Sequence, residues 1–197
     1  MKYLFYFILL YAHFASAQLR PRNQQQVFAL RYRLSAIKTM NYGDNFLAKA
    51  HDPAVGFGLA CDLIKINKFG FGLGYNFIYY SVNNIEKAGN INASRYHSTY
   101  GNLSYEIPIN EAFSIAPHIG LGAPTLYFKS GSRNFGSQNG TEIKLGFIGN
   151  YRMDDHFSFC FGVEYLSSTY SINTDPAFID YYSKANAIQV SLGIVLQ

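Results

Sequence analysis

The sequence predicts an all-β fold: an eight-stranded antiparallel up-and-down transmembrane β-barrel over residues 27–197. Large apolar residues alternate with small or polar ones in eight separate segments, which is the period of a β-strand. The connections between these segments alternate between short turns and long polar loops. Only 14% of the residues are charged, against about 25% in an ordinary soluble domain.

Residues 1–17 have the pattern of a secretory signal peptide. Lys2 precedes an apolar run, and Ala15, Ser16 and Ala17 form a cleavage site of the small-x-small type. The apolar run is far shorter than the roughly 20 residues that a membrane-spanning helix needs. We therefore expect cleavage after Ala17, followed by a short periplasmic leader at residues 18–26.

The first half of the mature chain contains four predicted strands: Val27–Lys38, Ala54–Ile66, Phe69–Tyr80 and Arg95–Ile107. The third is the clearest, with bulky residues at every second position and glycines between them. The fourth places Tyr96 and Tyr100 on the small-residue side. We therefore expect a bulge near Gly101, which would shift the alternation by one residue.

The second half contains four more predicted strands: Ala112–Phe128, Thr141–Met153, His156–Tyr170 and Ala185–Gln197. Pro117 and Pro124 count against the first of these, because proline has no N–H to donate within a sheet. Long loops are expected at Thr39–Pro53, Val82–Ser94, Lys129–Gly140 and Ser171–Lys184. Short turns lie at residues 67–68, 108–111 and 154–155. This arrangement is typical of a transmembrane barrel.

The alternation alone does not say which face is inside, because a soluble lipocalin-like ligand-binding barrel has the same period. A narrow lumen has no room for the Phe, Tyr and Leu of all eight strands, whereas lipid accommodates them. The opposite face is small, and the charges within the strands fall on it: Arg31, Arg33, Asp62, Glu106, Glu142, Lys144, Arg152 and Glu164. We interpret these eight residues as an interior ion-pair network that fills the lumen; a proton or ion path is the alternative. His118 is expected to join the network.

Other residues carry little sign of chemistry. Cys61 and Cys160 fall on opposite faces, which disfavours a disulfide. Asp44, His51 and Asp52 share a loop that could in principle form a hydrolase or acyltransferase site, but the sequence contains no catalytic or metal-binding motif. We therefore predict a non-enzymatic protein with no cofactor. The net charge of +4 is not concentrated in a basic run, so no nucleic-acid partner is expected.

The long-loop end carries residues suited to surface contacts. Six basic residues lie at this rim and either contact lipopolysaccharide phosphates or are solvated loop charges: Lys38, Lys49, Arg95, Lys129, Arg133 and Lys184. Four tyrosines are expected in an aromatic girdle at the membrane interface: Tyr79, Tyr127, Tyr165 and Tyr170. Five loop aromatics suit a binding surface: Tyr42, Phe46, Phe178, Tyr181 and Tyr182.

Several segments together resemble a known group of proteins. These are the leader ending at Ala17, the hairpin Val55–Tyr80, the run Tyr105–Pro108 and the run His118–Gly122. They resemble the small outer-membrane β-barrel proteins of Bacteroidota, the PorT-like or OmpX/OmpA-like group. The resemblance implies an integral protein of the bacterial outer membrane, in contact with its lipid and lipopolysaccharide.

The functional expectation is a barrel whose four long loops serve envelope integrity or surface interaction and adhesion, through a surface protein or host partner. The alternative is an accessory barrel of a secretion or gliding apparatus. Because one scaffold supports many functions, the sequence leaves the identity of the partner open.

Overall fold

The computed structural model of the chain describes residues 28–131 and 133–197. The predicted signal peptide and leader, residues 1–17 and 18–26, lie outside the described residues. Within the described part the fold is all-β, as the alternation predicts.

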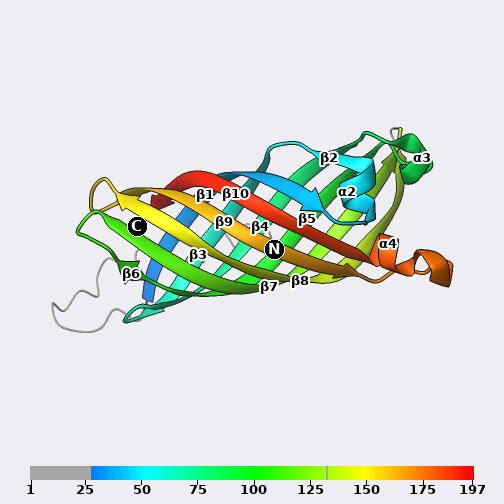
Figure 1. Cartoon of the computed structure of the whole chain (residues 1–197). Helices are drawn as coiled ribbons and strands as arrows, with labels where there is room; N and C mark the ends of the chain where they lie inside the picture. Colours follow the sequence, from blue (N-terminus) through cyan, green and yellow to red (C-terminus); the bar gives the residue numbers. More distant parts are fainter. Residues whose placement is uncertain (1–27, 132) are drawn as a thin grey trace, which may run out of the picture.

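Eight long antiparallel strands form a closed barrel (Figure 1). They are β1 (Phe28–Tyr42), β3 (Gly56–Ile66), β4 (Phe69–Val82), β5 (Ala93–Tyr105), β7 (Phe113–Ser130), β8 (Arg133–Arg152), β9 (Phe157–Tyr170) and β10 (Lys184–Leu196). Each long strand pairs with its neighbours along the chain, and β10 pairs with β1 to close the barrel. The predicted eight-stranded up-and-down barrel is confirmed. The long loop expected at Lys129–Gly140 is wrong, because β7 and β8 extend as a paired hairpin as far as Ser130 and Arg133.

The pairing is staggered around the barrel. Starting at Tyr42 and passing from partner to partner through β10, β9, β8, β7, β5, β4 and β3, the path returns to β1 at Tyr32, ten residues earlier. A stagger of this kind requires the strands to tilt against the barrel axis. An eight-stranded barrel has an interior just wide enough to be filled by its own side chains.

Short elements occupy the two ends of the barrel. Those in the long loops are α2 (Phe46–Ala50), β2 (His51–Pro53), α3 (Ile85–Ala88), η1 (Pro176–Phe178) and α4 (Ile179–Ser183), whereas β6 (Ile107–Pro108) lies at the short-turn end. Figure 1 shows α2, α3 and α4 together at one end of the barrel. Asn45 and Asn84 begin α2 and α3 by accepting hydrogen bonds from backbone N–H groups. None of the described helices is long and apolar enough to cross a membrane.

The bulky residues of the strands face outward. Leu34, Leu73 and Leu121 have 50%, 50% and 66% of their surface exposed, whereas Lys144 in the lumen has 0%. A soluble barrel with an apolar cavity has the reverse arrangement. The outward orientation of the bulky face follows the prediction.

The bulge expected near Gly101 is wrong. β5 pairs with β4 and β7 in unbroken register, so Tyr96 and Tyr100 do point into the barrel. Register shifts lie instead in β3, between Asp62 and Ile64, in the β1–β3 pairing between Phe28 and Arg31, and in the β7–β8 pairing between Phe128 and Lys129. Alternation cannot reveal the shift in β3, because Leu63 and Ile64 are both apolar and either fits the outward row.

Strand β7 also runs through two prolines. Pro117 lies opposite Phe147 and Pro124 opposite Ser98, and neither ends the strand. The predicted strand is therefore present despite the two prolines that count against it, because pairing on both sides of each proline holds the strand in place.

Candidate functional site: the barrel interior and its long-loop mouth

The middle of the lumen is closed by a buried ion pair. Lys144 Nζ lies 3.1 Å from Glu142 Oε1, and the side chains are 0% and 1% exposed. Glu142 also accepts hydrogen bonds from Tyr96, from Ser98 at 3.0 Å and from Ser168 at 2.9 Å. A buried carboxylate needs such partners to offset the loss of its hydration. The charge therefore lies in a fully occupied hydrogen-bonding shell.

A second buried carboxylate lies next to this pair. Glu164 Oε1 is 2.9 Å from His118 Nε2, and Glu164 Oε2 accepts a hydrogen bond from Gln189 at 3.0 Å. The Lys144 ammonium lies 4.6 Å from the centre of the Tyr100 ring, a cation–π distance. Together these residues form the central layer, which we define as Tyr100, His118, Glu142, Lys144 and Glu164. His118 contacts the acidic residues, as expected.

A separate group of charged residues lies in the lumen toward the short-turn end. Arg31 Nη1 is 3.3 Å from Glu106 Oε2, and Arg31 Nε is 3.9 Å from Asp62 Oδ2. Lys65 Nζ lies 2.5 Å from the same Glu106 oxygen. Arg33 lies between this group and the central layer, with Tyr100, Asp62 and Glu164 as its charged or polar neighbours.

Seven of the eight predicted interior residues thus lie in the lumen, in two groups joined by Arg33. Arg152 lies apart: it is exposed at the short-turn rim, where its guanidinium donates to the backbone carbonyl of Glu111. Lys65 was missed because the irregularity at Asp62 and Ile64 reverses the face of the residues that follow. The only signal in the sequence is a lysine in an otherwise outward-facing apolar run.

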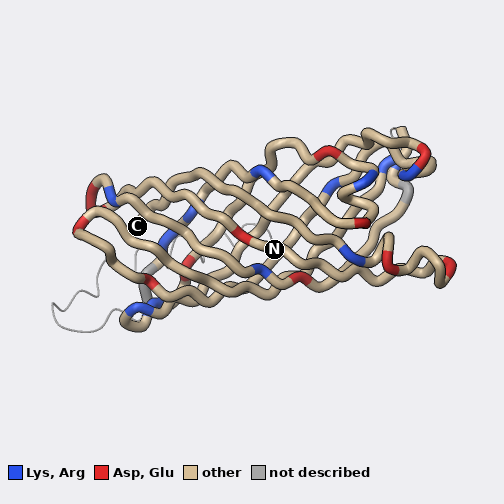
Figure 2. The backbone as a smooth tube through the Cα atoms, viewed as in Figure 1, with Lys and Arg blue, Asp and Glu red and all other residues tan. Residues whose placement is uncertain are grey.

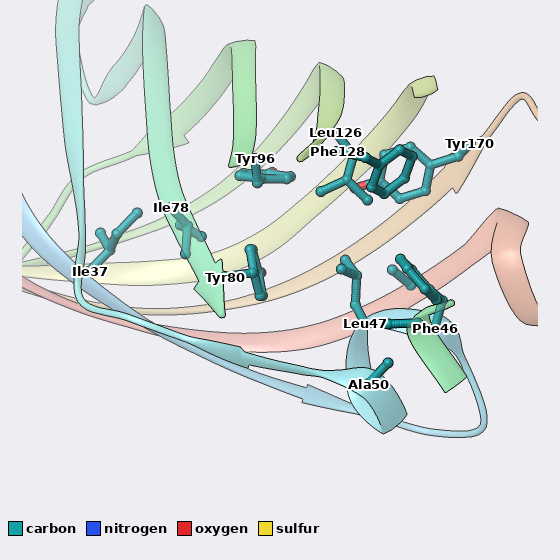
Figure 3. Close-up of a cluster of buried hydrophobic side chains, with 12 residues drawn as sticks. Ile37, Phe46, Leu47, Ala50, Ile78, Tyr80, Tyr96, Leu126, Phe128 and Tyr170 are labelled. Carbon is teal, nitrogen blue, oxygen red and sulfur yellow. The ribbon is translucent and has the colours of Figure 1, made fainter. Parts of the chain in front are cut away.

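The long-loop third of the lumen is apolar, which the sequence analysis did not anticipate. Inward-facing residues of the strands form one buried cluster with three residues of α2 and one of α3: Ile37, Phe46, Leu47, Ala50, Ile78, Tyr80, Ala88, Tyr96, Leu126, Phe128, Tyr170 and Ala185. Figure 3 shows Phe46 and Leu47 pointing from α2 toward Phe128 and Tyr170. We call this cluster the mouth core. It closes the barrel at the end that carries the long loops.

Aromatic contacts fix α2 over the mouth. The Phe46 ring lies 5.8 Å from the Phe128 ring and 5.1 Å from the Tyr182 ring. His51 follows α2 immediately, and the centre of its ring lies 4.5 Å from the centre of the Phe46 ring. Its Nε2 atom lies 2.9 Å from Ser94 Oγ. Burial lowers the pKa of His51 to about 4, because the charged ring would lose its hydration there.

Several loop aromatics are consequently not free for contacts. Phe46 is 3% exposed and Tyr170 4% exposed, and both belong to the mouth core rather than to a surface or a girdle. Tyr181 and Tyr182 pack against the same core. The expectation of a five-residue aromatic surface is therefore wrong in part, because α2 and α4 fold inward to bury their rings.

No catalytic constellation forms from Asp44, His51 and Asp52. The Asp44 carboxylate lies 3.9 Å from Lys49 Nζ, whereas the His51 ring faces Phe46 and Ser94. Ser94 is 0% exposed, so no substrate reaches its hydroxyl. Among residues 28–131 and 133–197, no three His, Cys, Asp or Glu side chains gather as metal ligands. Cys61 and Cys160 are free thiols, as predicted.

The basic residues of the long-loop rim fall into two sets. Lys184 lies 2.9 Å from Asp180, Lys49 3.9 Å from Asp44, and Lys38 donates to the carbonyl of Pro53 at 2.5 Å. In the described part of the chain, Arg95, Lys129 and Arg133 form no ion pair. Figure 2 shows several Lys and Arg residues near the end of the barrel where α3 lies.

Comparison with known proteins finds solved structures with a similar fold. No family model matches the chain, and no curated protein sequence matches it. Neisserial surface protein A aligns over 85% of this chain and 96% of its own, with a TM-score of 0.61 and 12% identity. The chain has the fold of the eight-stranded outer-membrane β-barrels.

A second solved structure supports the same fold. A major outer membrane protein from Thermus thermophilus aligns over 85% of this chain and 99% of its own, with a TM-score of 0.50 and 12% identity. At such identity the likeness concerns the outer-membrane barrel fold alone, because unrelated functions share this scaffold.

Proposed function

We propose that this protein is an integral, non-enzymatic protein of the bacterial outer membrane, whose long-loop end serves surface interaction or envelope integrity. The single observation that carries this proposal is the distribution of side chains on the closed barrel. Bulky apolar residues face outward on all sides, and the ion pairs Arg31–Glu106 and Lys144–Glu142 lie inside the barrel.

A barrel with this distribution of side chains has an outer surface that is favourable in contact with lipid and unfavourable in contact with water. Leu121 and Leu192 are 66% and 67% exposed and belong to an apolar outer surface that follows the barrel. Monomeric soluble proteins rarely expose apolar patches above a few hundred Å². In a bilayer the same surface contacts acyl chains, while a Lys or Arg facing lipid at the midplane would cost about 2–4 kcal/mol.

The interior network is proposed to be structural. The central layer and the mouth core both fill the lumen, so the charges hold neighbouring strands together rather than line an open path. Breaking a buried pair of this kind costs roughly 3–5 kcal/mol, because one charge is left without a partner.

The surface available for a protein or host partner lies beyond the mouth core. Apolar side chains remain exposed there, with Ile85 at 71%, Phe178 at 54%, Tyr42 at 44% and Ile179 at 43%. Exposed aromatic and aliphatic residues on a structured loop make effective contact points, because little further ordering is needed on binding. The PorT-like resemblance and a role in a secretion or gliding apparatus stay predictions.

The proposal is tested by fractionation and by a loop variant. The full chain should sediment with outer membranes, need detergent for extraction, and migrate differently on gels before and after heating. Phe178→Ala with Ile179→Ala should reduce adhesion of cells that display the protein. Ile109→Ala, at the exposed short-turn end, is the matched control.

Recovery of the protein in the soluble fraction without detergent would overturn the membrane assignment. Unchanged adhesion in the Phe178 and Ile179 variant, at equal surface abundance, would contradict the loop assignment alone.

A further inference from the structure

The outward face of β5 changes from polar to apolar along the strand. The rows of directly paired residues, starting at the long-loop end, are Tyr79, Arg95 and Tyr127; Phe77, His97 and Thr125; Tyr75, Thr99 and Ala123; and Leu73, Gly101 and Leu121. Successive rows are about 7 Å apart along the strand. A cation thus lies about 20 Å along β5 from a purely apolar row.

Residues of the upper three rows, together with Asn134, line a surface hollow of about 380 Å³, which we call the β5 groove. Its lining includes Arg95, His97, Thr99, Thr125 and Asn134. Tyr79 and Tyr127, at 40% and 42% exposure, flank Arg95 in the position of the aromatic girdle that marks a membrane interface. The groove therefore lies at the height where lipid head groups meet acyl chains.

Positive charge at the groove has no partner within the described part of the chain. Arg95, Lys129 and Arg133 form no ion pair there. Lys129 follows Tyr127 on the same face of β7, and Arg133 begins β8 directly opposite Ser130. Arginine presents a planar fork of donors that matches phosphate oxygens. The charge of the groove is therefore complementary to an anion.

His97 adds an oriented donor. Its Nδ1 lies 2.6 Å from Tyr75 Oη, and its ring packs edge-on against Phe77 and Tyr127 at 4.9 and 5.3 Å. When Tyr75 donates to Nδ1, the neutral ring carries its proton on Nε2. The ring is held in place by three neighbours, so in this tautomer Nε2 is a preorganised donor beside Arg95.

Below the polar rows, Gly101 leaves a slot between Leu73 and Leu121. A Cβ at this position would have its nearest neighbouring atom 3.8 Å away, on Leu73. The glycine is thus not required by close packing, and space remains on the lipid-facing side. The slot lies in the row of paired residues directly below the row of Tyr75, Thr99 and Ala123 that lines the β5 groove.

We propose that the β5 groove binds a phosphorylated glycolipid of the leaflet at the long-loop end. Its phosphate contacts Arg95 and His97, its sugar lies against Tyr127 and Asn134, and one acyl chain follows the slot over Gly101. A sugar phosphate is favoured over a phospholipid head because the groove combines the Arg95 cation with hydroxyl, amide and aromatic groups, and Lys129 and Arg133 lie beyond it toward the long loops. This assignment rests on the proposed outer-membrane location and names the lipid class that the barrel contacts there.

The test uses the full chain purified in detergent micelles and titrated with bisphosphorylated lipid A or with phosphatidylglycerol. Native mass spectrometry counts the lipid molecules retained. The unmodified chain should retain one lipid A with an affinity at least roughly tenfold above that for phosphatidylglycerol. Arg95→Gln should weaken lipid A binding about tenfold, because a hydrogen bond to a charged group is lost.

Two further variants separate charge from shape. Ala123→Leu fills the β5 groove without changing its charge, and it should weaken lipid A retention to a similar degree. Lys184→Gln removes a rim cation that already has Asp180 as a partner, and it should leave retention unchanged.

Equal retention by Arg95→Gln and the unmodified chain would overturn the site. Equal affinity for phosphatidylglycerol would overturn the sugar-phosphate assignment, and displacement by millimolar inorganic phosphate would overturn the lipid assignment. In each case the heat-dependent gel shift of the folded barrel remains as an independent readout, so a failed site is distinguishable from a failed membrane assignment.

Discussion

At the scale of the single residue, His51 shows how burial changes the chemistry of a side chain. The sequence places it in a loop with two aspartates, a setting that favours a charged imidazole. The structure turns its ring toward Phe46 and Ser94 and leaves it 2% exposed. Desolvation then outweighs the neighbouring Asp52 charge, and the pKa falls to about 4.

This lowered pKa predicts that the stability of the mouth core depends on pH. In the open or unfolded state His51 takes up a proton near pH 6.5, whereas in the closed state it does so only near pH 4. Stability of the closed mouth should therefore fall as pH drops from 6.5 to 4, by up to roughly 3 kcal/mol. Hydrogen exchange of residues 46–51 should accelerate accordingly, after correction for intrinsic rates.

His51→Gln keeps a hydrogen-bonding side chain beside Ser94 but cannot titrate. In this variant, the protection of residues 46–51 from hydrogen exchange should not change between about pH 7 and about pH 4.5, once the pH dependence of the intrinsic exchange rate is corrected for. His156→Gln, at an exposed turn, should behave like the unmodified chain. If His51→Gln keeps the full pH dependence, another group is responsible.

At the scale of the element, β4 illustrates why alternate positions are glycine. A Cβ at Gly74 would lie 2.2 Å from Cζ of the Tyr100 ring, which is packed over Lys144. Gly101 lies on the neighbouring strand, and a Cβ there would have 3.8 Å of clearance. The first glycine is required by a close approach, and the second is not.

We therefore predict different costs for the same substitution. Gly74→Ala should destabilise the barrel by roughly 1–3 kcal/mol through overpacking, whereas Gly101→Ala should change stability by less than about 0.5 kcal/mol. Urea unfolding in lipid vesicles measures both. In a Tyr100→Ala background the penalty at Gly74 should largely disappear, and equal penalties at the two glycines would contradict this account.

The short helices also have a role that their sequence does not indicate. α2 and α4 are too short to be stable alone, and their formation depends on burial against the mouth core. Loop aromatics that the composition suggests as a binding surface are used instead to close the barrel. This leaves Tyr42 and Phe178 as the exposed aromatics among the five predicted.

At the scale of the whole molecule, the lumen has two barriers in series. The central layer is a buried ionic network, and the mouth core is a buried cluster of aliphatic and aromatic side chains. An ion crossing the barrel would have to displace Lys144 from Glu142 and then pass Phe46, Tyr80 and Phe128.

The full chain should therefore show no steady single-channel conductance in planar bilayers at neutral pH. Phe46→Ala combined with Tyr100→Ala removes a large side chain from each barrier and should allow ions to pass, whereas either substitution alone should not. Defined conductance steps in the unmodified chain would instead support an ion path through the interior charges.

The sequence by itself determined the strand number, the outward apolar face and the inward position of most of the charges, because a period of two is a local property of the chain. Tertiary structure decided which charges meet, since ion pairs such as Arg31 with Glu106 depend on the stagger between strands and on one irregularity in β3. It also decided the mouth core and the β5 groove. Both combine residues from several strands, and the pairing register that brings them together is not written in the alternation of any single segment.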